Sequence, residues 1–517
     1  MKDSIYDKAL SDMLDNITSE IEKYSHKFIK HINRLSQIGI ALSAEKNINK
    51  LLEMIIQEAK TFTNADAGTL YLVENDHLKF EILYNDTMGV KLGGTTQKSI
   101  DLPPVPIKKN TVSGYVALTG EVVNIKDVYE NEEFDFKGPI KYDKKTGYRS
   151  KSFLCTPLKN HEDKIIGVLQ LINAKNEKDK IIPFAKEYEN IIYSLGSQAA
   201  ITITKTQLIQ DIENLFNSFV KVMATAIDER TPYNKKHTER VANYTIKIAE
   251  KINEIDTGRF KDIEFSDNEL AELNMAAWLH DVGKVAIPVN VMNKSTKLES
   301  TEAGFSGVKL RMKIYKKDLD VKLLKNLIDK KDYKKQLEKI NQYLQIIKNI
   351  NVQNKPLSDS QVEKLKKIYN DRYLSSSGEY KKFIKENEYK KLSIRKGTLS
   401  FREREIMKNH VVITKKLLEQ MPFIDKYKNV TEIATSHHEK LNGEGYPNKK
   451  TEEEIPLGGK ILAVADLYDA LTASDRPYKK RIENEKAFDI MRRAAEMREI
   501  DKDLLEIFIT NKLYEIS

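Results

Sequence analysis

Residues 435–450 are TSHHEKLNGEGYPNKK, and this stretch decides the fold class that we assign to the second half of the chain. It places two adjacent histidines directly before a turn that contains Gly443 and Gly445. The chain has only nine histidines, so two neighbouring ones need a physical reason. Adjacent residues of a helix point about 100° apart. The two imidazoles can therefore occupy different positions of one metal cluster, with the glycine turn folding the backbone over it.

Further metal-ligating side chains lie in apolar segments of the same half. His280 and Asp281 follow the apolar start of AAWLHDVGKVAIP. His410 lies on the apolar side of the helix predicted for FREREIMKNHVVITKKLLEQ. Asp466 lies in GKILAVADLYDALT, which is apolar nearly all round, and an unpaired carboxylate there is costly. Imidazole nitrogens and carboxylate oxygens suit Fe, Mn or Zn, so shared metal ions would satisfy these groups together.

The whole chain has the composition of a globular protein with several domains. Its 517 residues indicate two to four domains, and 40% of them are hydrophobic. The single cysteine, Cys155, excludes an intramolecular disulfide and favours a reducing compartment. The N-terminal sequence MKDSIYDKAL has no apolar core of a secretory signal, and no run approaches the roughly 18 apolar residues of a membrane span. We therefore expect a soluble, cytoplasmic protein without a membrane span.

The positive charge belongs to one segment. Residues 301–400 contain 25 Lys and Arg against 12 Asp and Glu, a net charge of +13. Since the net charge of the whole chain is +9, the other residues together have a net charge of −4. We interpret about 296–398 as a basic helical insertion. It is either a solvated helical face or an interaction surface. Nucleic acid is an unlikely partner, because the block has tyrosines but no recognised nucleic-acid-binding module.

The N-terminal half changes its hydrophobic period twice. Residues 1–30 have apolar positions at helical spacing, which predicts an amphipathic helical arm. Residues 31–205 begin with a helix and continue with short strand-like runs separated by Asn, Asp and Gly, which predicts an α+β domain with an antiparallel sheet. From Phe184 to about Arg230 the pattern is helical, interrupted only by Gly196. This connecting helix can pair with its copy in a homodimer.

The stretches ADAGTLYLV, NTVSGYVALTGEVVNIKDV and FLCTPLKNHEDKIIGVLQLINAKN resemble a GAF domain, a small-molecule sensor module. The resemblance covers about a third of the chain and implies an unknown small-molecule ligand. GAF domains that bind cyclic nucleotides carry Asn-Lys-x-x-Asp after the last strand. Here Asn173 is followed by Ala174, and the lysine is displaced to Lys175, which argues against a cyclic nucleotide. Cys155 is more simply a small core residue than a redox or haem contact.

The motifs HTERV, HDVGK, IMKNH, HHEKLNGEGYP and ADLYDALTASDRPYKK occur in this order between residues 225 and 510. Together they resemble the HD-GYP family, the HD-domain phosphohydrolases that open cyclic dinucleotides. The resemblance implies an all-α HD-type domain over residues 206–517, into which the basic block is inserted. It implies metal ligands at His237, His280, Asp281, His410, His437, His438 and Asp466. It implies phosphate contacts by Lys284, Arg476 and Lys479, and a pocket shaped by Gly445, Tyr446 and Pro447.

The resemblance also implies a reaction, the hydrolysis of cyclic di-GMP to linear pGpG. Asp281 would bridge two divalent transition metal ions, Fe or Mn, and Lys284 would stabilise charge on the phosphoryl oxygens. Some members have a further metal-binding Glu four residues before the first histidine, where this chain has Tyr233. A phenol is a poor ligand at neutral pH. We therefore expect two metals per chain and accumulation of pGpG.

Several assignments stay open at this point. Asp469 is either a further ligand or, as we favour, a structural hydrogen-bond partner. Glu439 is more simply a turn residue than a catalytic base, and Asn442 stands where the family commonly has Asp. The protein is alternatively a cyclic-dinucleotide receptor with low turnover, an HD phosphohydrolase on another nucleotide such as cyclic GMP-AMP, or a scaffold in which the insertion matters more than catalysis.

Overall fold

The computed structural model describes residues 2–96, 98–230, 236–352, 356–375, 378–473 and 482–515. The chain forms two compact units, Met1–Leu215 and Phe216–Ser517, each with hydrophobic cores of its own. None of the described helices is both long enough and apolar enough to cross a membrane.

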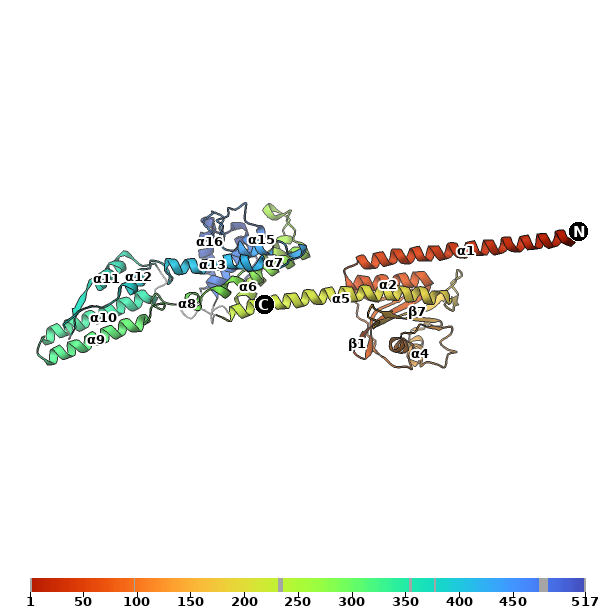
Figure 1. Cartoon of the computed structure of the whole chain (residues 1–517), viewed down its shortest axis with the longest axis horizontal. Helices are drawn as coiled ribbons and strands as arrows, with labels where there is room; N and C mark the ends of the chain where they lie inside the picture. The colour runs from red at the N-terminus through yellow and green to blue at the C-terminus, as the bar shows by residue number, and fades with distance from the viewer. Residues whose placement is uncertain are drawn as a thin grey trace. The chain divides into compact units, whose positions relative to one another are not determined.

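An antiparallel sheet forms the centre of the first unit (Figure 1). Its strands are β1 (Ala65–Glu74), β2 (His77–Asn85), β3 (Val90–Gly93), β4 (Val105–Pro106), β5 (Val123–Ile125), β6 (Phe153–Lys159), β7 (Ile165–Lys175) and β8 (Ile181–Ile182). The main path is β3-β2-β1-β7-β6-β5, with β4 beside β2 and β8 beside β7. The predicted α+β class with an antiparallel sheet is confirmed.

Helices cover both faces of this sheet. They are α1 (Lys2–Ala44), α2 (Ile48–Thr63), α3 (Val112–Thr119), α4 (Lys137–Thr146) and the first part of α5 (Glu187–Asp228). The core between the sheet and α1, α2 and α5 contains Leu42, Ile55 and Leu195. The sequence pattern predicted an arm followed by a separate helix, whereas α1 is continuous to Ala44. The break comes at Asn47, whose side chain accepts a hydrogen bond from the Lys50 N–H and begins α2.

The second unit is predominantly helical. Its helices are the end of α5, α6 (His237–Asn253), α7 (Asp267–Leu279), α8 (Val289–Met292), α9 (Gly304–Leu324), α10 (Lys330–Val352), α11 (Asp359–Asn370), α12 (Glu386–Leu392), α13 (Phe401–Leu418), α14 (Val430–Thr435), α15 (Leu457–Thr472), α16 (Asn484–Glu496) and α17 (Lys502–Thr510). Short 3-10 turns are η2 (Gly258–Phe260), η3 (Val282–Ala286) and η4 (Asp425–Tyr427). The main core draws on α6, α7 and α13 to α17, as the predicted HD-type helical domain requires.

The basic block between α8 and α13 is a folded subdomain. Helices α9 to α12 and a two-stranded hairpin, β9 (Arg372–Leu374) with β10 (Tyr380–Lys382), enclose a separate core. Val308, Ile347 and Phe383 are among its fully buried members. The block is therefore more than a solvated helical face, and its small hairpin was not predicted from the sequence.

A buried ion cluster attaches the insertion to α13. Glu403 lies 2.8 Å from Lys294 Nζ and 2.9 Å from Lys391 Nζ, and the Lys294 side chain is fully buried. Burial favours the neutral acid, but the two ammonium groups hold the pKa of Glu403 well below its ordinary value of 4.5. Glu403 also closes the capping box of α13 with Ser400. One carboxylate thus joins the insertion to a helix that carries a candidate metal ligand.

We expect Glu403→Gln to destabilise this junction by about 3–5 kcal/mol, because it leaves Lys294 buried without its counter-charge. A carboxyl whose pKa is lowered by folding stabilises the fold above its unfolded-state pKa. The advantage of the wild type should therefore be complete above about pH 4.5 and vanish as the pH falls further. Urea unfolding as a function of pH measures it, with the half-exposed Glu405→Gln on the same helix as the control. Equal stability of both variants at neutral pH would refute the role of the cluster.

Candidate metal centre

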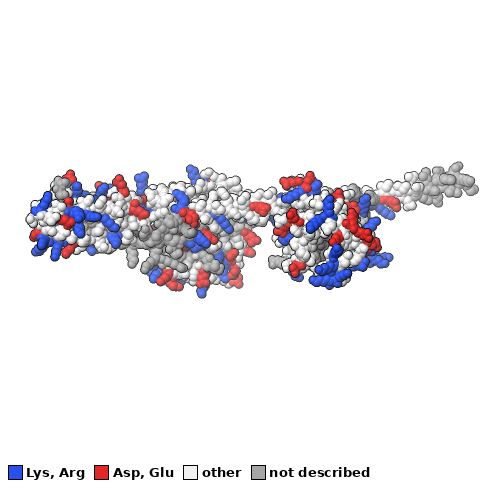
Figure 2. Space-filling view, turned by 90° about the horizontal axis from the view of Figure 1, so that it is seen from below, with Lys and Arg blue, Asp and Glu red and all other residues white. Residues whose placement is uncertain are grey.

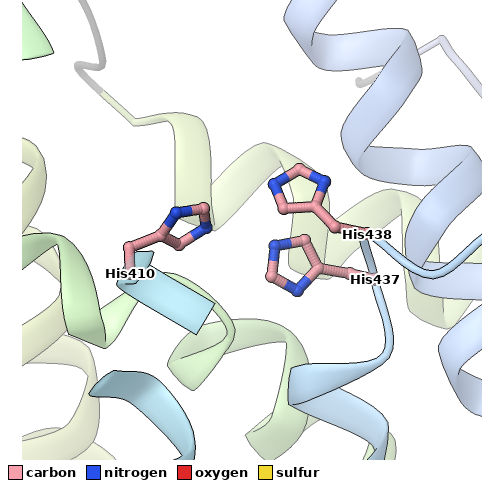
Figure 3. A group of neighbouring side chains, drawn as sticks. All are labelled: His410, His437 and His438. Carbon is pink, nitrogen blue, oxygen red and sulfur yellow. The ribbon is translucent and has the colours of Figure 1, made fainter. Parts of the chain in front are cut away.

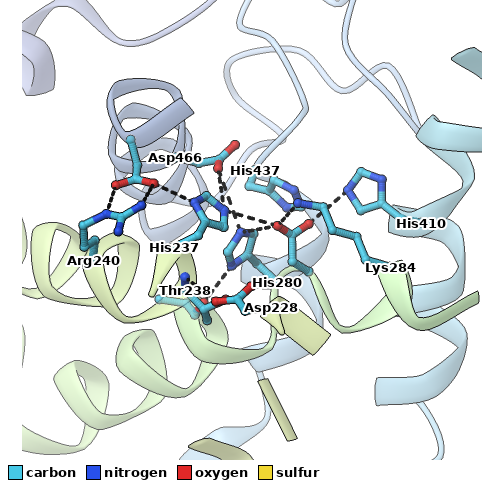
Figure 4. Close-up of polar contacts among 12 residues, drawn as sticks. Asp228, His237, Thr238, Arg240, His280, Lys284, His410, His437 and Asp466 are labelled. Atoms are coloured by element: carbon cyan, nitrogen blue, oxygen red, sulfur yellow. Dashed lines mark hydrogen bonds and ion pairs between the residues drawn. The ribbon is translucent and has the colours of Figure 1, made fainter. Parts of the chain in front are cut away.

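Five helical elements bring the predicted ligands together (Figure 4). His237 is the first residue of α6, and His280 and Asp281 directly follow α7. His410 lies in α13, and Asp466 lies in α15. His437 and His438 come two and three residues after the end of α14. These helices pack through the main core of the unit, so residues far apart in the sequence share one interior site.

Asp281 lies at the centre of the cluster. Its Oδ2 is 3.0 Å from His280 Nε2 and 3.4 Å from His237 Nε2, and its Oδ1 is 3.3 Å from His410 Nε2. Asp466 Oδ1 lies 3.4 Å from the same His237 nitrogen. Lys284 Nζ makes an ion pair with Asp281 Oδ2. The carboxylate of Asp281 therefore faces candidate ligands on both sides.

The ring nitrogens of three histidines are oriented by the backbone. Nδ1 of His280, His410 and His437 lies 2.6–2.7 Å from the carbonyl oxygen three residues earlier. A carbonyl can only accept, so Nδ1 carries a proton, and in the neutral ring Nε2 is the nitrogen that presents a lone pair. All three Nε2 atoms are buried and make no hydrogen bond, and those of His280 and His410 face the oxygens of Asp281 at 3.0 and 3.3 Å. Buried acceptors without partners are costly, which is the strongest structural sign that these nitrogens bind something.

The donor atoms are close enough to share metal ions. Three trios have ligand atoms within 4.8 Å of one another: His410, His437 and His438; His237, His280 and Asp466; and His280, Asp281 and His437. Figure 3 shows the imidazoles of His410, His437 and His438 turned toward one another. Nitrogen and oxygen donors in this mixture fit a divalent transition metal such as Fe, Mn or Zn. The seven predicted ligands are thus adjacent, while metal binding by them remains a prediction.

The electrostatics of the cluster suit metal binding. Burial lowers the pKa of His437 to about 3, and the neighbouring His280 adds to the effect. Burial together with His437 and His410 also holds the pKa of His438 well below its ordinary value. Burial would raise the pKa of Asp281, but the charges of Lys284 and His280 hold it far below its ordinary value. Burial would also lower the pKa values of His237 and His280, but Asp281 raises that of His280, and Asp281 with Asp469 raises that of His237 to about 9. His437 and His438 are therefore neutral near pH 7, as metal binding requires, whereas His237 and His280 must release a proton to bind a metal.

Asp469 orients His237. Its Oδ2 lies 2.8 Å from His237 Nδ1, on the opposite side of the ring from Asp281. Arg240 donates two hydrogen bonds to the same carboxylate, at 2.6 and 2.9 Å. A carboxylate that holds the far nitrogen of a ligating histidine fixes the ring and strengthens the ligand. These hydrogen bonds agree with the structural role that we favour for Asp469, which stays a prediction.

The glycine-rich turn after His438 is closed by Glu439 and Gly445. The buried carboxylate of Glu439 accepts hydrogen bonds from the Asn448 and Lys450 N–H groups, so it is a turn residue. A Cβ on Gly445 would lie 2.4 Å from the backbone nitrogen of Lys440, so only glycine fits there. Asn442, which replaces the common Asp, donates to the Met497 carbonyl at 3.0 Å. An aspartate could not make that bond.

Tyr446 lies against the cluster. Its backbone N–H donates to the His438 carbonyl, and its ring centre is 4.7 Å from that of His438. Pro447 follows it in the same turn. Arg476 and Lys479, which we predicted as phosphate contacts, and Tyr233 lie outside the described residues. Of the predicted phosphate contacts, Lys284 is therefore the one that the structure places at the site.

Thr414 aligns two ligand-bearing segments and was not identified from the sequence. Its hydroxyl donates to the His280 carbonyl at 3.2 Å and accepts the Gly283 N–H at 2.9 Å. A Cβ on Gly283 would lie 2.0 Å from the His410 carbonyl oxygen. The segment after His280 can therefore approach α13 this closely only with glycine at position 283.

The C-terminal end of α5 also contacts the site and was missed in the sequence. Asp228 accepts the Thr238 N–H at 3.0 Å, next to His237. Arg230 donates to the carbonyl oxygens of Lys284 and Val285. The helix that we predicted to connect the domains thus ends on residues adjacent to a candidate ligand and to the candidate phosphate contact. Only the general signal of an acidic residue before a helix start could have indicated Asp228.

Comparison with known proteins agrees with this architecture. Residues 47–203 match the GAF domain family, and residues 235–352 and 387–504 match HD domain families. The chain combines a GAF domain with an HD-type helical region. The two HD matches end at 352 and resume at 387, both inside the insertion.

Two phosphodiesterases are similar over part of their length. The dual 3',5'-cyclic-AMP and -GMP phosphodiesterase 11 of Drosophila melanogaster is 28% identical over 244 residues, which covers 44% of this chain and 16% of that protein. The dual phosphodiesterase 11A of Takifugu rubripes is 28% identical over 198 residues, which covers 38% of this chain and 21% of that protein. The match therefore spans about a fifth or less of these relatives.

Among solved structures, the GAF domain/HD domain protein from Geobacter sulfurreducens is 14% identical and has a TM-score of 0.25. It covers 32% of this chain and 98% of that chain. The GAF domain of an Acinetobacter phosphoenolpyruvate-protein phosphotransferase is 16% identical and has a TM-score of 0.27. This match covers 35% of the present chain and 98% of the Acinetobacter chain. Such low scores do not bear on function.

Proposed function

We propose that this chain is a metal-dependent phosphodiesterase that hydrolyses cyclic di-GMP to linear pGpG under the control of its GAF domain. The carrying observation is the set of three buried Nε2 atoms that make no hydrogen bond, of which those of His280 and His410 lie 3.0 and 3.3 Å from the Asp281 carboxylate. The HD domain matches support a phosphohydrolase, and the printed names of the two relatives support phosphodiester chemistry. The cyclic dinucleotide as substrate rests on the HD-GYP motifs of the sequence.

The residues have separate roles in this proposal. Metal ions held by the seven ligands would supply positive charge and activate water at neutral pH. Lys284, whose side chain is 18% exposed, would place a cation next to the phosphoryl oxygens. Asp469 would keep His237 in its ligating tautomer. Tyr446 offers an aromatic face beside His438 on which a guanine could stack.

The deciding experiment combines metal counting with product identification. Anaerobically purified protein should contain two Fe or Mn ions per chain, and cyclic di-GMP should give pGpG that accumulates before any GMP. Parallel reactions with cyclic GMP-AMP, 3',5'-cyclic GMP and 3',5'-cyclic AMP test the alternative substrates. Tight binding of cyclic di-GMP without product would favour the receptor. Three metals per chain, or GMP as the first product, would overturn the two-metal proposal.

The GAF domain has room for a ligand. A cavity of about 650 Å³ lies against the sheet beside α3 and α4, and its wall includes Tyr71, Phe136 and Tyr148. Tyr148 is held by Asp66, which also pairs with the displaced Lys175. We propose a small molecule of unassigned identity as its occupant. Thermal shifts of the full chain with a panel of nucleotides and metabolites would identify it, and Phe136→Ala should weaken the effective ligand.

We also propose a homodimer through α5. Six exposed apolar side chains recur on one side of this helix at coiled-coil spacing: Ile201, Leu208, Ile212, Leu215, Phe219 and Val222. They are 47–71% exposed in the single chain. Apolar positions with this repeat are the seam that a partner helix covers, and a second copy supplies the matching seam.

We expect the double substitution Ile212→Glu and Leu215→Glu to raise the dimer dissociation constant by about 100-fold or more, because like charges would face each other in the seam. Sedimentation velocity over a range of concentrations measures it. Gln210→Glu adds a charge on the other side of the same helix and should leave the dimer intact. A wild-type chain that is monomeric at all concentrations would contradict this assignment.

A further inference from the structure

We propose that the insertion docks on membrane surfaces that contain anionic lipids, through the outer face of α9 and the turn that follows it. The contacting side chains, called here the α9 apolar face, are Leu310, Ile314, Val321, Leu324 and Leu327. Leu324 is 82% exposed and Leu327 is 68% exposed. This inference does not depend on the metal centre or on catalysis.

The spacing of these residues explains why they are exposed together. Leu310, Ile314, Val321 and Leu324 follow one another at intervals of four, seven and three residues, so they lie on one side of the helix. The other side, with Val308, Met312 and Leu319, is buried in the core of the insertion. Helix α10 lies beside α9 (Figure 1), and its Ile340 and Ile347 belong to the same core. The apolar side chains of α9 are therefore divided between the core and solvent.

The surroundings of the α9 apolar face are strongly basic. Residues 304–335 contain eleven Lys and Arg and four Asp, a net charge of +7. Lys313, Lys317 and Lys325 are exposed next to the apolar side chains. Figure 2 shows Lys and Arg side chains gathered over the insertion. Positive side chains around exposed leucines complement a surface that is anionic outside and apolar beneath.

The positive charge and the exposed leucines together favour a lipid bilayer over the other possible partners of the α9 apolar face. A second copy of residues 304–335 would bring its own net charge of +7 against this one, so self-association is opposed. A nucleic acid would use the lysines but would leave Leu324 and Leu327 without a role. A bilayer surface satisfies both, because lysine stems lie along apolar surface while their charges reach the headgroups. The expected contact is peripheral, with α9 lying along the surface.

The test is sedimentation of the full chain with vesicles of phosphatidylcholine alone or with phosphatidylglycerol added. We expect binding only when phosphatidylglycerol is present and at least a tenfold decrease at high salt, since exposed charges are screened. Leu324→Ser with Leu327→Ser should weaken vesicle binding by about tenfold or more, because two aliphatic side chains no longer enter the apolar layer. These side chains are outside the core, so circular dichroism should show an unchanged fold.

Ile424→Ser is the matched control, because Ile424 is 60% exposed elsewhere in the helical unit. It should bind vesicles like the wild type. No binding to anionic vesicles, or binding that the leucine substitutions leave unchanged, would overturn the proposal. If the chain bound duplex DNA or an acidic protein but no vesicles, the membrane proposal would also be overturned, and the α9 apolar face would be assigned to that partner.

Discussion

Asp281→Asn should lower phosphodiesterase turnover by about a thousandfold or more and reduce the metal content of the purified protein. The carboxylate of Asp281 lies within 3.0–3.4 Å of Nε2 atoms from three histidines, so its loss should affect more candidate ligands than any other single substitution in the cluster. An amide has nearly the same shape but carries no charge and only one acceptor oxygen. The substitution therefore tests the chemistry of the site rather than its packing.

The measurements are metal counting by mass spectrometry, a product time course on cyclic di-GMP and far-ultraviolet circular dichroism. Asp489→Asn is the control, because that carboxylate is 67% exposed on α16 and should leave all three readings unchanged. Full metal occupancy in Asp281→Asn would show that Asp281 is not a ligand. Loss of helical signal would instead mean that the carboxylate holds the fold, and His410→Gln then provides the second test of the site.

Lys284→Met should lower turnover by about 100- to 1000-fold while the metal stays bound. The Lys284 ammonium is paired with Asp281, its side chain is partly exposed, and no lysine can act as a ligand while protonated. Its loss removes a charge that stabilises the phosphoryl oxygens in the transition state. Methionine keeps most of the length and the apolar stem, so the local packing should survive.

The informative result for Lys284→Met is an unchanged metal content together with a lowered turnover. Lys486→Met, at a lysine that is 70% exposed, serves as the control and should behave like the wild type. An unchanged rate would show that Lys284 serves only as the counter-ion of Asp281. Loss of metal would show that the lysine positions that carboxylate, and the phosphate contact would then have to be sought elsewhere.

Much of the architecture was predictable from local sequence. The change from helical to strand periodicity at Ala65 and the return to helix after Phe184 predicted the α+β unit, because these periods arise from burial of one face of each element. The segments around His280, His410 and Asp466 predicted an interior site, since polar side chains in apolar helices need partners. Whether these residues bind metal, and which substrate they act on, stay predictions.

Tertiary structure decided what no local pattern contains. His237 meets Asp469 across 232 positions, and Gly283 meets Thr414 across 131, because these contacts depend on how whole helices pack. The insertion pattern predicted helices but not that they enclose their own core, since the buried side of α9 is defined only by the helices against it. The sequence by itself determined which candidate ligand side chains this protein has and which helices carry them. Packing alone determined which of those groups face each other, because a hydrogen bond across two hundred residues leaves no periodic trace in the chain.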